Sequence, residues 1–200
     1  MPLERALERS DQWMRECASL VNGASFDTTN RLRVAVSLLH LCIEHQTGIH
    51  SLVNLGVIGS AFALLRPQLE AYVRGIWYHR CATDQQVTAF LGGAEPPKIG
   101  ALIGALQTLD GFDAVLLNDL KKKVWRNLND FTHGGTIQVK ARISMNEIAS
   151  NYKYEHIAGL LASAATFSLL AGVGLAAAIG SESLAQGLYA AYHRIYETAV

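Results

Sequence analysis

The chain contains little proline and no excess of charge of either sign. It has 4 prolines in 200 residues, and its 17 Lys and Arg residues balance its 17 Asp and Glu residues. Half of the residues are hydrophobic and only 17% are charged, which excludes a disordered chain, because disorder requires low hydrophobicity and high net charge. A net charge of zero gives no global field that attracts nucleic acid or an anionic membrane. The length predicts one domain over residues 1–200.

Cysteine is also scarce. Cys17, Cys42 and Cys81 are odd in number and include no C-x-x-C pair, which excludes a disulfide framework and a cysteine-based zinc site. The chain has no P-loop, dinucleotide fingerprint, G-x-S-x-G or H-E-x-x-H motif, so we expect neither a cofactor nor a metal. His40 and Glu44 can share a helix face, but no second ligand pair accompanies them, and we interpret the nearby histidines as core or interface residues.

The first residues mix both charge signs and match neither a signal peptide nor a transit peptide. With its free cysteines, the chain is therefore expected in the cytoplasm. Residues 157–179 carry no charge and are long enough to span a membrane. Because Ala, Gly, Ser and Thr dilute their apolar residues, we predict a buried core helix there. A membrane-associated segment is the alternative.

Apolar residues recur with helical spacing along most of the chain, and no series of strands is present. The sequence predicts an all-α, single-domain bundle of about six or seven helices, interrupted by an internal loop at 92–98. Residues 136–144 alternate enough for an extended segment or a small hairpin arm. A short helix is predicted to be capped by Asp84 and to end at Gly92, and Pro67 is expected to be a kink or a fresh first turn in the helix over 57–81. The other predicted helices cover 3–21, 31–55, 98–109, 113–132, 146–179 and 181–198.

One local motif, W-R-N-L-N-D-F-T-H-G-G, stands at the end of the helix predicted over 113–132. Arg126 and His133 are seven residues apart, so they differ in direction by only about 20° around a helix. Asn129 and Asp130 fall between them, and the apolar stripe of this helix points the opposite way. The motif therefore predicts a polar face that the core does not use.

Histidine and arginine together can perform chemistry on a phosphodiester. Histidine is suited to accept a 2′-hydroxyl proton near neutral pH, and arginine stabilises charge that develops on phosphate oxygens. Such internal attack requires RNA as the substrate. In the alternative interpretation, His133 only complements the dipole at the helix C-terminus, and Arg126 only pairs with Asp130 one turn away.

The residues Arg126-Asn127, followed by His133 near the end of a small α-bundle, resemble the signature of the HEPN superfamily. The F-T-H-G-G ending and the upstream L-L-R-P-Q-L-E also look similar to uncharacterised bacterial HEPN-like families. The resemblance implies a metal-independent endoribonuclease that works as a homodimer, often in toxin–antitoxin or phage-defence systems. It implies that Arg126 and His133 are catalytic and that Asn127 supports them, with products that carry 2′,3′-cyclic phosphate ends.

Other cations are candidates for RNA binding. Lys122 and Lys123 lie in a locally basic stretch, and we expect them to contact phosphates with Arg66. In the alternative interpretation, this stretch is only a solvated face. Arg66, Glu70 and Arg74 have the spacing of an ion-pair ladder that fixes helix packing, or alternatively Arg66 supplies a second cation to the motif. Expected partners are RNA, a second copy of the chain, and an antitoxin or nucleotidyltransferase, but not DNA. The alternative function is a non-catalytic helical binding or dimerisation module.

Overall fold

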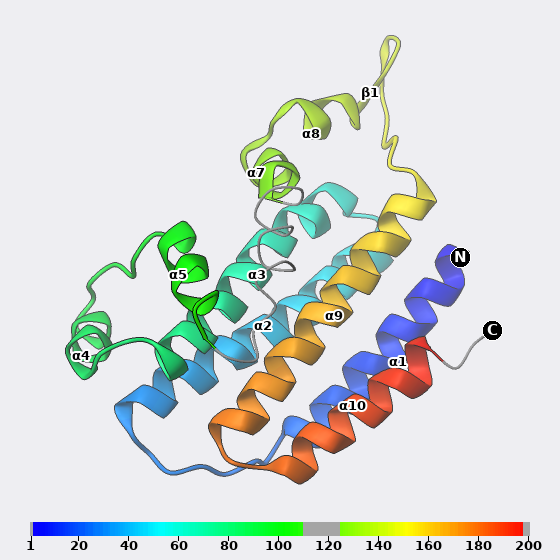
Figure 1. Cartoon of the computed structure of the whole chain (residues 1–200). Helices are drawn as coiled ribbons and strands as arrows, with labels where there is room; N and C mark the ends of the chain where they lie inside the picture. The colour runs from blue at the N-terminus through cyan, green and yellow to red at the C-terminus, as the bar shows by residue number, and fades with distance from the viewer. Residues whose placement is uncertain (1, 110–124, 198–200) are drawn as a thin grey trace.

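The computed structural model describes residues 2–109 and 125–197, with the backbone alone for residues 125–127. The described part confirms the predicted all-α bundle (Figure 1). Its elements are α1 (Leu3–Val21), α2 (Asn30–Asn54), α3 (Ile58–Arg80), α4 (Asp84–Leu91), α5 (Ile99–Leu106), α7 (Trp125–His133), α8 (Thr136–Lys140), β1 (Ile143–Ser144), β2 (Glu147–Ile148), α9 (Tyr154–Ala178) and α10 (Glu182–Tyr196).

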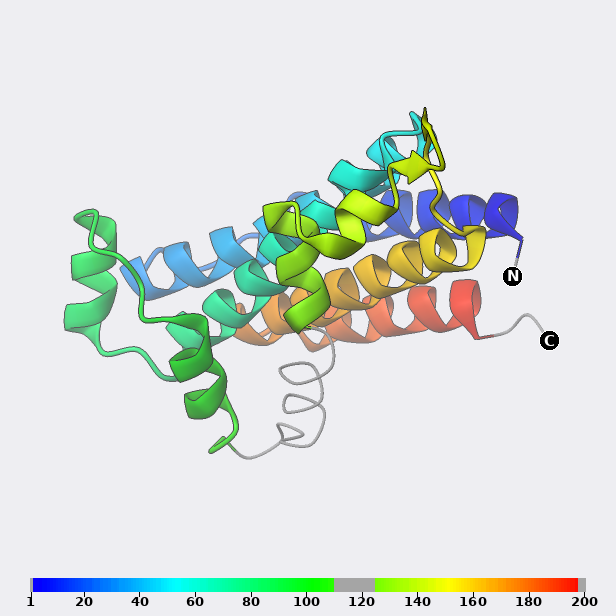
Figure 2. The ribbon, with the colours of Figure 1, turned by 90° about the horizontal axis from the view of Figure 1, so that it is seen from above.

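Five long helices, α1, α2, α3, α9 and α10, form the body of the molecule. Figure 2 shows α4 and α5 toward one end of these helices and the β1–β2 hairpin at the other. The hairpin is antiparallel, with Ile143 opposite Ile148 and Ser144 opposite Glu147. Helix α7 packs on α3, and α8 connects it to the hairpin.

Helix α9 is the central element of the bundle. It contacts α1, α2, α3 and α10, and with 25 residues and a hydropathy of 1.9 it is long and apolar enough to cross a membrane. Its most apolar window is 61% buried, and the residues exposed between positions 157 and 178 are Gly159, Thr166 and Ala177. A helix facing lipid would expose large apolar side chains instead. This packing supports the core-helix interpretation.

Small residues allow the central helices to approach closely. A Cβ added to Gly75 would lie 2.7 Å from Leu39 Cγ, and one added to Gly174 would lie 2.6 Å from Ile76 Cδ1. Both separations are too short for real carbon atoms, so a side chain at either glycine would require Leu39 or Ile76 to shift. Small residues in 157–179 make a membrane span less favourable. In this fold they allow the neighbouring helices to pack closely.

Pro67 lies inside α3, which continues from Ile58 to Arg80, so Pro67 does not start a new helix. Proline has no N–H, which leaves the carbonyl of the residue four positions earlier without its helical partner. That carbonyl belongs to Ala63 and lies 3.4 Å from Thr132 Oγ1, whose single hydroxyl proton is also directed at the Leu128 carbonyl 2.8 Å away. Pro67 therefore leaves a carbonyl of α3 that faces the Thr132 hydroxyl of α7.

Three sequence predictions need correction. Thr83, rather than Asp84, caps α4, because its hydroxyl and the Gln86 side chain form a reciprocal capping box. Residues 136–140 are helical rather than extended, and the hairpin begins only at Ile143. The long apolar helix begins at Tyr154 rather than Asn146, because backbone hydrogen bonds continue the hairpin as far as Asn151. Of the predicted helix 113–132, residues 113–124 lie outside the described part.

Candidate functional site

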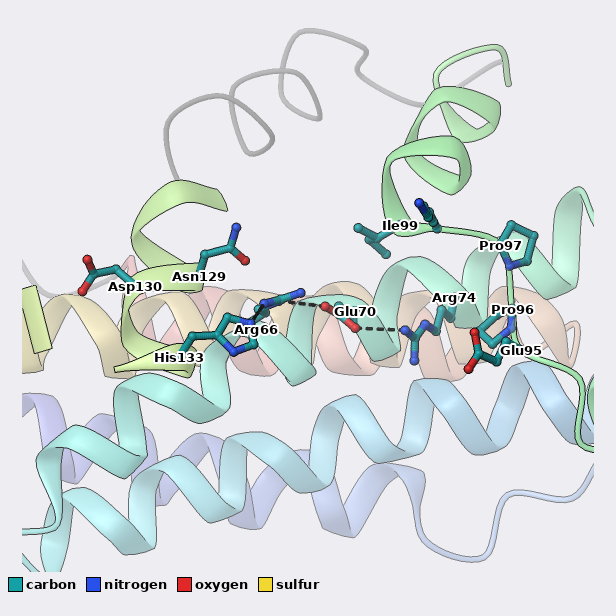
Figure 3. A pocket seen from close by; sticks show the side chains of 11 residues that line it. Arg66, Glu70, Arg74, Glu95, Pro96, Pro97, Ile99, Asn129, Asp130 and His133 are labelled. Carbon is teal, nitrogen blue, oxygen red and sulfur yellow. Dashed lines mark hydrogen bonds and ion pairs between the residues drawn. The ribbon is translucent and has the colours of Figure 1, made fainter. Parts of the chain in front are cut away.

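An open cleft of about 930 Å³ lies between α3, α7 and the segment that leads into α5 (Figure 3). Its floor is α3, the last turns of α7 form one end, and the proline-containing loop forms the other. The lining residues are Arg66, Glu70, Arg74, Glu95, Pro96, Pro97, Lys98, Ile99, Asn129, Asp130 and His133.

Apolar contacts hold α7 against α3 at one end of the cleft. Phe131 stacks on Phe62 with ring centroids 4.4 Å apart, and Leu128 is only 3% exposed. The buried Gln138 amide adds polar contacts, because its Nε2 donates to the Gly59 and Phe131 carbonyls and its Oε1 accepts from the Tyr152 hydroxyl. With the apolar side of α7 fixed in this way, its opposite side faces the cleft, as the sequence predicts.

Arg66 and His133 meet at this end of the cleft. Arg66 Nη1 lies 2.6 Å from His133 Nε2. Arginine has only donors, so Nε2 accepts this hydrogen bond and the ring proton of the neutral imidazole is on Nδ1. The cation beside His133 therefore comes from α3, far away in the sequence.

Glu70 connects Arg66 to a second arginine. Its Oε1 accepts from Arg66 Nε at 2.9 Å, and its Oε2 accepts from Arg74 Nη2 at 3.0 Å. The Glu70 side chain is 17% exposed, against 21% for Arg66 and 34% for Arg74. The predicted ion pairs of Arg66 and Arg74 with Glu70 are present. Arg66 also lies beside His133, which is the position that the alternative interpretation expects.

Asp130 contributes to folding more than to the cleft. Its Oδ1 accepts hydrogen bonds from the backbone N–H groups of Ile137 at 2.8 Å and Gln138 at 3.1 Å, so it caps α8. Gly135 makes this contact feasible, because a Cβ there would lie 2.4 Å from the Asp130 carboxylate. The carboxylate expected to pair with Arg126 thus has backbone partners.

The other predicted site residues are only partly described. Arg126 and Asn127 lie in the first turn of α7, in the same helix as His133, so the predicted two-turn spacing between Arg126 and His133 holds. Their side chains, together with all of Lys122 and Lys123, lie outside the described part of the chain.

Sequence analysis missed one wall of the cleft. Glu95, Pro96, Pro97 and Lys98 line it, although they were assigned only to an internal loop. Nothing in their local pattern indicates that the fold brings them close to Arg74. The described lining therefore holds Arg66, Arg74 and Lys98 against three carboxylates, two of which already accept hydrogen bonds.

No group of three or more His, Cys, Asp or Glu residues in the described ranges could hold a metal ion. His40 and Glu44 are both exposed, so His40 is not a core residue. His45 and His50 are partly buried, and this burial lowers the pKa of each imidazole.

The fold and the cleft define an all-α bundle protein with an arginine–histidine pair on an open, polar surface. The chain belongs to DUF6988, a family of unknown function, which matches residues 39–199. The match starts within α2 and includes every residue that lines the cleft. No curated protein and no solved structure matches the chain.

Proposed function

We propose that this protein is a metal-independent endoribonuclease of the HEPN type. The observation that carries the proposal is the contact of Arg66 Nη1 with His133 Nε2 at 2.6 Å in an open cleft. In this contact a group that can accept a proton lies beside a cation of the kind that can bind phosphate, and cleavage of RNA by its own 2′-hydroxyl uses such a pair. The HEPN-like placement of Arg126 and His133 on α7 adds support.

The two side chains divide the reaction between them. A phosphodiester oxygen is a stronger acceptor for guanidinium than imidazole is, so bound RNA draws Arg66 onto the phosphate and leaves His133 Nε2 free. Nε2 then takes the 2′-hydroxyl proton, and the 2′-oxygen attacks phosphorus. The P–O5′ bond breaks, and the 5′-oxygen leaves with a proton from solvent. The products are a 2′,3′-cyclic phosphate and a 5′-hydroxyl.

The remaining predicted residues have supporting roles in this proposal. Arg126, by resemblance, adds a second cation at the reacting phosphate, and Asn127 supports it. Lys122 and Lys123 contact phosphates outside the reacting centre. His133 has no carboxylate hydrogen-bonded to its Nε2 in the described structure, and Arg66 occupies that position instead.

The test is incubation of a mixed RNA pool with the pure protein in EDTA. We expect cleavage that Arg66→Ala, Arg126→Ala and His133→Ala each abolish. Arg80→Ala is the matched control, because Arg80 is exposed at the end of α3 and does not line the cleft. Cyclic phosphate ends on the products identify the chemistry. Absence of cleavage by the folded protein, or cleavage that survives His133→Ala, contradicts the proposal.

A second candidate function, a dimerisation module without catalysis, is favoured by the exposed hairpin. Ile143 is 55% exposed, Met145 93% and Ile148 98%. A two-stranded hairpin is marginal alone in water, and apolar side chains of this exposure mark association surfaces. The occupant in this proposal is a second copy, because identical free strand edges pair around a two-fold axis.

Sedimentation of the full chain tests this dimer. We expect Ile148→Asp to convert it into a monomer, whereas Ser144→Asp, on the opposite face of the ribbon, leaves it dimeric. A monomeric wild-type protein contradicts the dimerisation proposal. A dimer through the hairpin is also compatible with nuclease activity, because the resemblance implies that HEPN-type enzymes work as homodimers. The RNA cleavage assay therefore decides between the catalytic and the non-catalytic function.

The cellular setting is proposed on the same resemblance: a cytoplasmic toxin or defence protein, controlled by an antitoxin or a nucleotidyltransferase. The burial of the large apolar side chains of α9 argues against a membrane span by this helix, as a cytoplasmic protein requires. Purification as a discrete species without detergent tests that requirement, and a need for detergent overturns the cytoplasmic location.

A further inference from the structure

The geometry points to a second phosphate subsite at the far end of the cleft, formed by Arg74 and Lys98. In this inference, one single-stranded nucleic-acid segment crosses the cleft over Glu70, with one phosphate at Arg66 and His133 and another at Arg74 and Lys98. The inference rests on the proposed function, which places the reacting phosphate beside His133.

The spacing along α3 separates the two subsites. Arg66 and Arg74 are eight residues apart, which corresponds to about 12 Å along the helix axis. Figure 3 shows Arg66, Glu70 and Arg74 in a row along α3, with His133 near one end and the Glu95–Pro97 segment near the other. One phosphate group is too small to contact both arginines, whereas two phosphates of the same strand can do so.

Glu70 positions the side chains of Arg66 and Arg74 without neutralising the positive charge of both. Each guanidinium has five N–H donors. Glu70 engages Nε of Arg66 and Nη2 of Arg74, and Arg66 Nη1 also contacts His133. Two cations share one carboxylate, so this trio keeps one positive charge. The bridge also holds the two long side chains in place, which lowers the entropy lost when phosphate binds.

Lys98 adds charge from the opposite wall. Its side chain is exposed, lines the cleft, and makes no hydrogen bond or ion pair with the described residues. Helix α5 begins directly after it, at Ile99, with no side-chain cap on its first N–H groups. A helix N-terminus favours anions, so it complements the two cations at this end.

The rest of the wall indicates recognition of the backbone rather than of the bases. None of the described lining residues is Phe, Tyr or Trp, the rings on which bases stack in many single-strand binders. Pro96, Pro97 and Ile99 supply only apolar contact. Glu95 places a carboxylate near the subsite, which lowers its affinity for phosphate. We therefore expect binding with little sequence preference.

A single-stranded 2′-deoxy oligonucleotide tests the subsite, because it binds through phosphates but lacks the 2′-hydroxyl needed for cleavage. Anisotropy titrations are expected to show that Arg74→Ala and Lys98→Ala each weaken binding by roughly fivefold to tenfold and reduce the salt slope by about 0.7. Glu95→Gln is expected to tighten binding. Arg80→Ala, outside the cleft, leaves binding unchanged.

The outcomes separate this inference from the proposed nuclease activity. Oligonucleotide binding that depends on Arg74 and Lys98, without any cleavage of RNA, supports the subsite and contradicts the nuclease. Cleavage that depends on His133 but shows the same KM in Arg74→Ala and Lys98→Ala overturns the subsite alone.

If Arg74→Ala fails to fold, Lys98→Ala decides, because the described fold does not depend on its side chain. When both proposals hold, these variants raise KM and leave kcat unchanged.

Discussion

Arg66 on α3 and His133 on α7 are 67 positions apart in the sequence, and their Nη1 and Nε2 atoms are 2.6 Å apart. This contact joins two features that sequence analysis treated separately, the ion-pair ladder of α3 and the polar face of α7. Glu70 holds the Nε side of the Arg66 guanidinium, so one residue of α3 and one residue of α7 orient it together.

Arg66→Lys distinguishes the shape of the cation from its charge. Lysine keeps the charge but lacks the planar fork that contacts Glu70 and His133 at once. We expect kcat for RNA cleavage to fall by about 10²-fold to 10³-fold, as for loss of one donor to a developing oxyanion. Stability should fall by no more than about 1 kcal/mol, because the pair is partly exposed. Single-turnover kinetics and thermal melts measure both, with Arg80→Lys as the control. Unchanged kcat would remove Arg66 from the mechanism.

Asp130→Ala is expected to act on stability. The substitution removes the carboxylate that caps the Ile137 and Gln138 N–H groups, and loss of a helix cap costs about 0.5–2 kcal/mol. Asp130→Asn keeps Oδ1 as an acceptor and should retain most of that stability. Urea denaturation of both variants measures the difference. If Ala and Asn are equally destabilising, the charge of Asp130 matters and the capping role assigned to it is incomplete.

The long helices could be predicted because their signals are local. The caps at Thr29 and Ser181 and the glycine that follows α7 act within one helical turn of the residues they affect. Gly134 adopts a φ of +66° directly after His133, a left-handed conformation that glycine favours and that commonly ends a helix. The sequence shows that Arg66 is an arginine on a predicted helix, which is enough to propose it as a second cation but not to predict its contact with His133.

The rest depends on contacts between distant segments. Residues 136–140 alternate like a strand, yet Asp130 caps them into a helix from the preceding element. The cleft wall at Pro96 and Lys98 forms only when the loop after α4 folds back against α3. No periodicity within residues 92–98 encodes that approach, so the sequence predicted a loop and not a binding surface.

The glycines of the core provide a direct test of helix packing. Gly75→Ala places a Cβ 2.7 Å from Leu39 Cγ and 3.2 Å from the Leu39 backbone nitrogen. Overpacking of this kind costs about 1–3 kcal/mol. Gly159→Ala is the matched control, because it lies in α9 with nothing within 4 Å of the added carbon, and it should stabilise by about 0.5–1 kcal/mol. Denaturation midpoints that move in the same direction for both variants would contradict this packing of α2 against α3.

Partly buried histidines predict that the fold weakens in mild acid. Burial lowers the pKa of His45, His50 and His79 below the ordinary value of 6.5, and Arg80 and Arg31 lower that of His79 further. The unfolded chain therefore binds protons before the folded chain does. The stability from these groups is complete above pH 6.5 and is lost as the pH falls through their folded pKa values.

His50→Gln isolates one of these groups. His50 Nδ1 lies 3.2 Å from Ser10 Oγ, which also accepts a hydrogen bond from Gln46 Nε2. The Ser10 hydroxyl proton is thus available to a neutral His50 ring, and a glutamine oxygen can replace that acceptor without titrating. We expect the variant to lose less free energy of unfolding than wild type between pH 6.5 and about 5, and to match it in slope above pH 7. Arg194 lowers the pKa of Glu16 below its ordinary 4.5, so that loss falls at lower pH and does not overlap. An unchanged acid slope in His50→Gln would show that His50 does not contribute to it.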